Sequence, residues 1–175
     1  TVHKRWNNNT AILSGDAMLA ISLQMLIKNN LDDNNNLVKT YIDGLLSVCE
    51  GQALDIEFES RSDVSIDEYK NMIYLKTAYM IGLSSQIGGI LSNLDQKEII
   101  LLKNFGDSIG MAYQVQDDLL ELFSNSDSMN KSLYSDFSLH KKTFLWTSTN
   151  SKDRAELQDL IVLFSNDKDG TIRKL

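Results

Sequence analysis

Residues 95–123 read DQKEIILLKNFGDSIGMAYQVQDDLLELF, and this stretch sets the fold class of the chain. Apolar side chains recur along it at three- and four-residue spacing, the period of an amphipathic helix. Asp95 and Glu98 form a D-x-x-E pair at its start, which is typical of a helix N-terminus. We therefore predict one long helix that ends at about residue 123.

The rest of the chain also has helical periodicity, and no strand pattern competes with it. Ser65 and Glu68 form a second capping-box signature. The 175 residues include no proline, whereas average usage of about 5% would give roughly nine. We predict an all-α bundle with residues 1–175 in a single domain. The further helices are expected at residues 10–29, 37–59, 66–92, 139–149 and 153–164.

Composition excludes several classes of protein. The net charge is −7, from 17 basic and 24 acidic residues, which disfavours generic nucleic-acid binding. Cys49 is the only cysteine, so an internal disulfide is excluded and a reducing compartment, the cytoplasm, is expected. Every long apolar run is interrupted by polar residues, and we predict no transmembrane segment. The opening TVHKRWNNNT lacks an initiator Met and a signal peptide, which predicts a fragment.

Polar residues share one face of the 95–123 helix. With Asp117 at zero, Glu121 lies at about 40°, Gln114 at about 60° and Asp118 at about 100° around the helix axis. A solvated acidic face is one interpretation of this pattern. The dense apolar residues around the acids instead predict a mostly buried helix, in which carboxylates need partners. Oxygen ligands without His or Cys suit Mg²⁺.

Small residues and lysines extend the same region. Gly106 and Gly110 lie near the stripe of acids and leave room for a neighbour or a ligand. Lys76 and Thr77 lie mid-way along the expected 66–92 helix, among apolar residues, where a lysine needs a partner. Lys131 and Lys141 flank a polar loop after the acidic helix and are placed to close on an anion, although loop lysines are mostly solvated.

Taken together and in order, these motifs resemble the trans-isoprenyl diphosphate (polyprenyl) synthase family. The stretch F-G-x-x-x-G-x-A-Y-Q-V-Q-D-D-L-L-E is similar to the family's second aspartate-rich motif and its approach. The other matching motifs are A-I-L-S-G-D at 11–16, G-Q-x-x-D at 51–55, K-T-A at 76–78 and the lysine loop at 130–144.

The resemblance implies an isoprenoid-synthase-type helical bundle, a homodimer, that lengthens an allylic diphosphate with isopentenyl diphosphate into a longer linear trans-polyprenyl diphosphate. It implies that Asp117, Asp118 and Glu121 bind Mg²⁺. It also implies that Lys76, Thr77, Gln114, Lys131 and Lys141 contact the allylic diphosphate, with the first three in catalytic positions. An apolar tail is then expected to run past Gly106 and Gly110.

The sequence departs from the family pattern in ways that keep alternatives open. The first aspartate-rich motif is absent, so we expect this chain alone to be inactive, and Glu121 replaces the usual third Asp. A class I terpene cyclase shares the metal–diphosphate chemistry and is the main alternative enzyme. A non-catalytic scaffold or regulatory subunit of a prenyl synthase, or a purely structural bundle with incidental acids, also fits the helical pattern.

Overall fold

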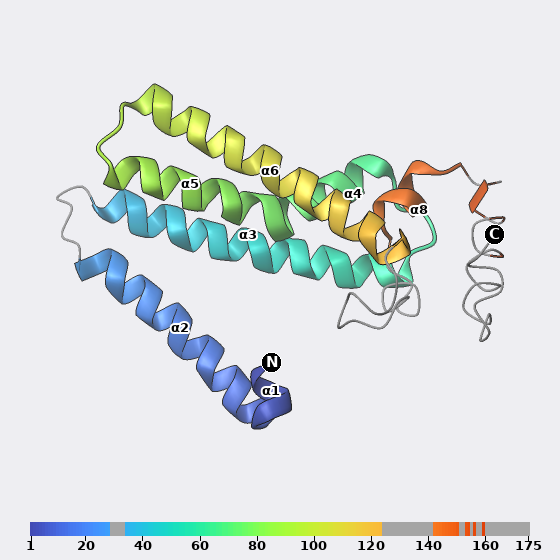
Figure 1. Cartoon of the computed structure of the whole chain (residues 1–175), viewed down its shortest axis with the longest axis horizontal. Helices are drawn as coiled ribbons and strands as arrows, with labels where there is room; N and C mark the ends of the chain where they lie inside the picture. Colours follow the sequence, from blue (N-terminus) through green and yellow to red (C-terminus); the bar gives the residue numbers. More distant parts are fainter. Residues whose placement is uncertain (29–33, 124–141, 151–152, 155, 157–158, 160–175) are drawn as a thin grey trace. The chain divides into compact units, whose positions relative to one another are not determined.

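In the part of the chain that it describes, the computed structural model consists of helices and short connections without a strand, which confirms the predicted fold class (Figure 1). It describes residues 1–28, 34–123, 142–150, 153, 154, 156 and 159; at 34–36 and 121–123 it describes the backbone alone. The elements are α1 (Val2–Arg5), α2 (Asn8–Lys28), α3 (Asn34–Ser60), α4 (Ile66–Ile73), the π-helix η1 (Tyr74–Ala78), α5 (Tyr79–Leu91), α6 (Gln96–Phe123) and α8 (Phe144–Ser148).

The chain divides into two compact units, Thr1–Gly44 and Leu45–Leu175, with the boundary inside α3. In the first unit, the hydroxyl groups of Ser22 and Tyr41 lie 2.5 Å apart and join α2 to α3. All residues of the candidate site described below belong to the second unit. A single domain over residues 1–175 stays a prediction.

Helix α2 differs from the other long helices because none of its residues is buried. Most of its large apolar side chains are exposed, Met18 to 71% and Leu13 to 68%. By length and composition it is apolar enough to cross a membrane, with a mean hydropathy of 1.6. Core helices and signal sequences also meet this criterion, so the predicted absence of a transmembrane segment stays a prediction.

Both predicted capping boxes are present. Ser65 Oγ accepts a hydrogen bond from the backbone N–H of Glu68 at 3.2 Å, and the Glu68 carboxylate accepts one from the backbone N–H of Ser65 at 2.9 Å. The bond from the Ser65 N–H, a second from the Ser65 hydroxyl at 2.9 Å and one from Arg61 at 2.8 Å lower the pKa of the Glu68 carboxyl group to about 2. Asp95 and Glu98 exchange the same pair of bonds at the start of α6, at 2.9 and 3.1 Å. Local side-chain chemistry therefore sets both helix starts.

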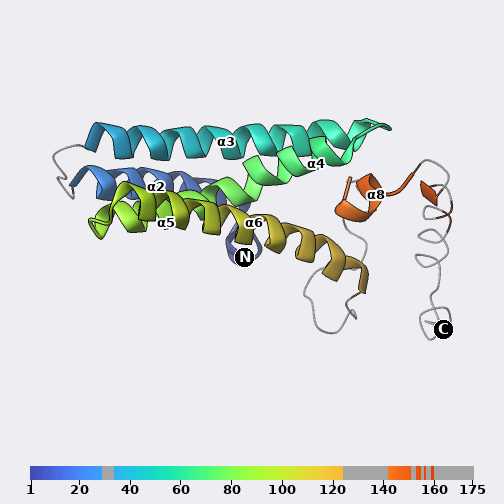
Figure 2. The same ribbon diagram turned by 90° about the horizontal axis from the view of Figure 1, so that it is seen from above.

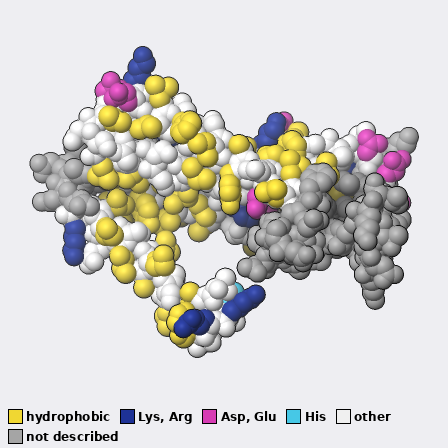
Figure 3. All heavy atoms as spheres, in the orientation of Figure 1, with side chains coloured by type: hydrophobic (Ala, Val, Ile, Leu, Met, Phe, Trp, Pro, Cys, Tyr) yellow, Lys and Arg dark blue, Asp and Glu magenta, His cyan; other side chains and the backbone are white. Residues whose placement is uncertain are grey.

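The buried core of the second unit lies where α3, α4, α6 and α8 meet (Figure 2). It is formed by Phe58, Val64, Tyr69, Met72 and Ile73, with Met111, Val115 and Phe144 packed against it. The prediction of a mostly buried 95–123 helix holds only on this side. Tyr113 is 57% and Leu120 is 45% exposed, and other apolar side chains also remain at the surface over α5 and α6 (Figure 3).

Gly106 and Gly110 face a neighbouring helix, which corrects the expectation that an apolar tail runs past them. A Cβ atom on Gly110 would lie 2.5 Å from the Cα of Ala78, and one on Gly106 would lie 2.8 Å from the Cα of Gly82. Helices α5 and α6 therefore approach each other at backbone distance here. The space that the missing side chains leave is filled by η1 and α5.

The single helix predicted for residues 66–92 is interrupted by one π turn. The backbone N–H of Tyr79 donates to the carbonyl of Tyr74, five residues back, where an α-helix would use the fourth. Of the expected 139–149 helix, the structure describes residues 142–149, and within them only α8 (Phe144–Ser148) is helical. Of the expected 153–164 helix, only Asp153, Arg154, Glu156 and Asp159 are described, and their backbone is helical.

Candidate active site

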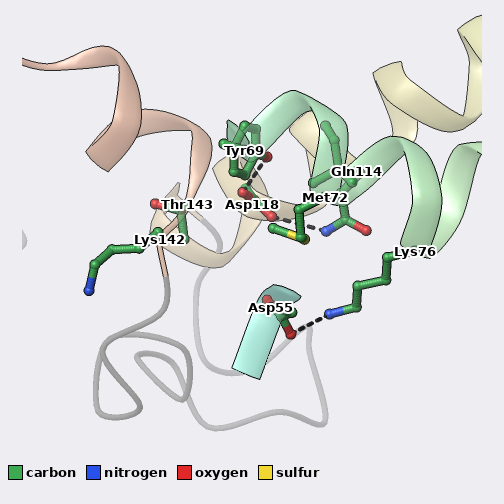
Figure 4. A pocket seen from close by; sticks show the side chains of 9 residues that line it. Asp55, Tyr69, Met72, Lys76, Gln114, Asp118, Lys142 and Thr143 are labelled. Atoms are coloured by element: carbon green, nitrogen blue, oxygen red, sulfur yellow. Dashed lines mark hydrogen bonds and ion pairs between the residues drawn. The ribbon is translucent and has the colours of Figure 1, made fainter. Parts of the chain in front are cut away.

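A pocket in the second unit brings together residues from α3, α4, η1, α6 and the start of α8 (Figure 4). Its empty volume, counted to its open side, is about 310 Å³. Two of its lining residues, Lys76 and Gln114, are predicted catalytic residues. The full lining is Asp55, Tyr69, Met72, Ile73, Lys76, Gln114, Asp118, Lys142 and Thr143.

Lys76 reaches across the pocket to a carboxylate on α3. Its Nζ lies 2.6 Å from Asp55 Oδ2, and the side chains are 25% and 9% exposed, respectively. Gln52 Nε2, one turn earlier on α3, lies 3.5 Å from the same oxygen. The ammonium group has three protons, so it can bind Asp55 and still offer donors to a ligand on the open side of the pocket.

The backbone around Lys76 is fixed by Gly51 on α3. A Cβ atom on Gly51 would overlap the backbone nitrogen of Lys76 and would lie 2.7 Å from its Cα. Only glycine allows α3 to approach η1 this closely. The G-Q-x-x-D motif thus supplies a close contact at Gly51 and a carboxylate at Asp55, one turn apart on the same face.

Thr77 and Gln114 form the next part of the site. The Thr77 hydroxyl donates to Gln114 Oε1 at 3.0 Å, and Gln114 Nε2 donates to Asp118 Oδ1 at 3.0 Å. Because a carboxylate only accepts, Asp118 holds the Gln114 amide with its oxygen toward Thr77. The three predicted residues Lys76, Thr77 and Gln114 are therefore brought to one place.

Asp118 lies in the wall of the pocket and is only 8% exposed. Its Oδ2 atom accepts hydrogen bonds from the Tyr69 hydroxyl at 2.7 Å and from the backbone N–H of Phe144 at 2.9 Å. Burial and the adjacent Asp118 charge raise the pKa of Tyr69 well above its usual value, so this hydroxyl keeps its proton. Sequence reasoning missed Tyr69, whose position among apolar residues indicated only a core role.

The predicted metal ligands are partly described. Asp117 is half-buried, and no hydrogen bond to its carboxylate is found among the residues that the structure describes. Glu121 lies on α6, but its side chain is outside the described set. Within that set, no group of three His, Cys, Asp or Glu residues is close enough to hold a metal ion. Asp117 itself fits Mg²⁺, because carboxylate oxygens are its preferred protein ligands.

The lysines after α6 are only partly placed. Lys131 and Lys141 lie outside the described residues. Lys142, which sequence reasoning passed over, lines the pocket beside Thr143; its only sequence signal was its position next to Lys141. Figure 4 shows its amine directed away from Lys76, and the ammonium group lies 5.7 Å from the centre of the Trp146 ring. Burial, followed by the charge of Arg154, lowers the pKa of Lys142.

Comparisons of the sequence with known proteins identify its family. The family model described as polyprenyl synthetase matches residues 1–175. A short chain isoprenyl diphosphate synthase from Methanothermobacter thermautotrophicus is 35% identical over 168 residues, which cover 91% of this chain and 51% of that protein. A geranylgeranyl diphosphate synthase from Saccharolobus solfataricus is 32% identical, with 93% and 50% coverage. The chain therefore spans about half the length of the curated relatives it matches.

Solved structures give the same result for the fold. A crystal structure of a geranylgeranyl pyrophosphate synthase matches with a TM-score of 0.83 and 38% identity, over 99% of this chain and 54% of that one. A heptaprenyl diphosphate synthase from Staphylococcus aureus matches with a TM-score of 0.81 and 29% identity, over 90% of this chain and 50% of the other. Both similarities extend over nearly all of the present chain.

Proposed function

The chain belongs to the polyprenyl synthetase family, and on that premise we propose that it carries half of the active site of a trans-prenyltransferase. The reaction joins an allylic prenyl diphosphate to isopentenyl diphosphate and gives a longer linear prenyl diphosphate. The observation that carries the proposal is that Lys76 and Gln114 line one pocket, with Thr77 hydrogen-bonded to Gln114 at 3.0 Å. These three residues come from two helical segments that are far apart in sequence.

The roles of the residues follow from their chemistry. Lys76 donates to a diphosphate oxygen and stabilises the negative charge that develops on the leaving group. Asp55 holds the Lys76 ammonium group at 2.6 Å, so the cation is positioned before substrate binds. Thr77 and Gln114 bind and orient the allylic end of the same substrate. Lys131 and Lys141 are proposed as further diphosphate contacts by their place in the family motif.

We assign Mg²⁺ to the acidic cluster of the family motif. Asp117 and Glu121 are the proposed ligands, and the part played by Asp118 is argued below. When bound, Mg²⁺ supplies positive charge that stabilises the diphosphate leaving group as the allylic carbon–oxygen bond breaks. The remaining proposals are a cytoplasmic location and a homodimer, with residues 1–175 forming one partial polyprenyl synthetase domain and no transmembrane segment.

Product analysis tests the proposed reaction. A hybrid protein is made in which residues 1–175 replace the matching half of the Methanothermobacter synthase, and it is incubated with allylic and isopentenyl diphosphates and Mg²⁺. Longer linear prenyl diphosphates support the proposal. Cyclic hydrocarbons would point to a class I terpene cyclase. Absence of any product from a folded hybrid would favour a non-catalytic scaffold or regulatory subunit. The 175-residue chain alone is expected to be inactive.

A further inference from the structure

Two neighbouring acids on α6 have different surroundings. Asp117 is half-buried without a hydrogen bond among the described residues, whereas Asp118 is 8% exposed and accepts three. The donors to Asp118 come from three elements: the Tyr69 hydroxyl on α4, Gln114 Nε2 on α6 and the Phe144 backbone N–H on α8. Consecutive residues of a helix point about 100° apart, which is why one acid is enclosed and the other is not.

The bond to Phe144 replaces a local helix cap. Thr143 is the N-cap residue of α8, yet its hydroxyl makes no cap bond and is buried without a partner among the described residues. The Asp118 carboxylate caps α8 in its place, from a different helix. The first turn of α8 therefore depends on α6 for an acceptor.

Tyr69, on α4, also contacts the start of α8. Its ring packs against the ring of Phe144 with 6.1 Å between centroids, and its hydroxyl donates to the oxygen that caps α8. The side chain is 1% exposed, so without Asp118 the hydroxyl would be buried and unpaired. Tyr69, Asp118 and the Phe144 amide form one buried unit, which we call the α8 clasp.

We infer that Asp118 and Tyr69 are positioning residues that anchor the start of α8, and that the neighbouring acids Asp117 and Asp118 have different roles. Asp117 remains available to metal, while Asp118 is occupied as an acceptor. Lys142 and Thr143 immediately precede Phe144 and line the pocket, so the α8 clasp holds this wall of the pocket in place. Its catalytic consequence rests on the proposed function, but the anchoring itself does not.

Amide hydrogen exchange tests the anchoring in the 175-residue chain. We expect Asp118→Ala to lower the protection of the Phe144 amide by about tenfold or more, and Tyr69→Phe to lower it by a smaller factor. Asp118→Asn keeps an acceptor oxygen, and the Gln114 amide can turn to pair with the new NH₂ group, so protection is restored to within about threefold. Asp117→Ala is the matched control and should leave it unchanged.

The amides of α5 report whether each variant is folded, because Gly82 and Gly89 of α5 pack against residues 99–107 of α6, about three turns or more before Asp118. Unchanged Phe144 protection in Asp118→Ala would overturn the inference. So would an equal loss in Asp117→Ala, or a loss in Asp118→Asn as large as in Asp118→Ala. Calorimetry of Mg²⁺ with inorganic pyrophosphate tests the proposed function separately. If Asp117→Ala binds both like the wild type, the metal assignment fails while the α8 clasp can still stand.

Discussion

Two lysine–aspartate pairs in the second unit have nearly the same geometry and different surroundings. Lys76 lies 2.6 Å from Asp55 and Lys103 lies 2.7 Å from Asp107, and the lysines are 25% and 24% exposed. The Lys103 pair joins two residues one turn apart on α6. Its ammonium group also lies near the rings of Tyr74 and Tyr79, 5.9 and 5.0 Å from their centres. The Lys76 pair joins two different elements and borders a pocket.

The difference distinguishes an enclosed ion pair from the pair that we propose to be functional. Lys103 is surrounded by its carboxylate and two aromatic rings, which satisfy the cation within the protein. Lys76 has one close carboxylate and an open side. A short distance between opposite charges therefore does not by itself indicate a functional site. Open space beside the cation, where a ligand can bind, is the more informative feature.

The largest expected effect is on catalysis and would test this contrast directly. In the hybrid enzyme, Lys76→Ala should lower kcat/KM for the allylic diphosphate by about 100-fold, because a donor to the leaving group is lost. Lys103→Ala is the matched control and should change kcat/KM by less than about threefold, since the expected contribution of Lys103 is to packing. Steady-state kinetics would show this, and equal losses in the two variants would break the distinction.

The glycines beside the two pairs predict a smaller difference in stability. Gly51→Ala places a methyl group against the backbone of Lys76, which cannot rotate away, and should destabilise the chain by about 2–3 kcal/mol. Gly82→Ala places it against the Asp107 carboxylate and 3.0 Å from the backbone oxygen of Lys103, a contact that a small shift relieves. Because that side chain can turn, we expect a cost of about 1 kcal/mol. Urea unfolding measures both, and a larger loss for Gly82→Ala would contradict the expectation that the backbone of η1 yields less than the Asp107 side chain.

The smallest effect is a pH dependence of the Lys103 pair. Burial lowers the pKa of Lys103, but the hydrogen bond and charge of Asp107, with Tyr74, outweigh it, and the net pKa is raised above its usual 10.5. The charged form is therefore favoured by folding. Its stabilisation is complete below pH 10.5 and is lost as the pH rises through the higher pKa of the folded state.

This pH dependence can be isolated with Lys103→Met. The difference in free energy of unfolding between wild type and variant should shrink as the pH rises above 10.5, the usual lysine pKa. Lys70→Met, which removes an exposed lysine 3.9 Å from Asp67, is the control for the loss of one positive charge. A constant difference for Lys103→Met would indicate that the variant acts through packing with the tyrosines alone.

Local sequence patterns predicted most of the fold. Apolar periodicity located α2, α3 and α6, and the Ser65–Glu68 and Asp95–Glu98 pairs gave two helix starts, because these signals act between residues within one or two turns. The π turn was not predicted, since one extra residue barely disturbs an apolar pattern. Gly106 and Gly110 were expected to leave room for a neighbour or a ligand, and periodicity could not decide between the two, because it shows that a face is open and not what fills it.

The candidate site was predicted only in part for the same reason. The residue types at Lys76, Thr77 and Gln114 resemble a family motif, and the structure brings them together. The Asp55–Lys76 ion pair spans 21 residues and the Tyr69–Asp118 bond spans 49. Contacts between residues so far apart in the chain give no signal in the local sequence pattern. The expectation that Asp118 binds metal treated adjacent acids as equivalent, and only the three donors around Asp118 distinguish it from Asp117.

The π turn has a consequence for how this pocket can change. Deleting one residue from η1 would restore regular α-helical pairing and rotate α5 by about 100° relative to α4. Gly82 would then leave Asp107, and Ala78 would leave Gly110, so the α5–α6 contact would lose its fit. The extra residue of the π turn therefore sets two things at once: the position of Lys76 and Thr77, and the packing of α5 against α6. A point mutation can therefore change one side chain of the site at a time. A change in the backbone of η1 would also alter the packing of the core.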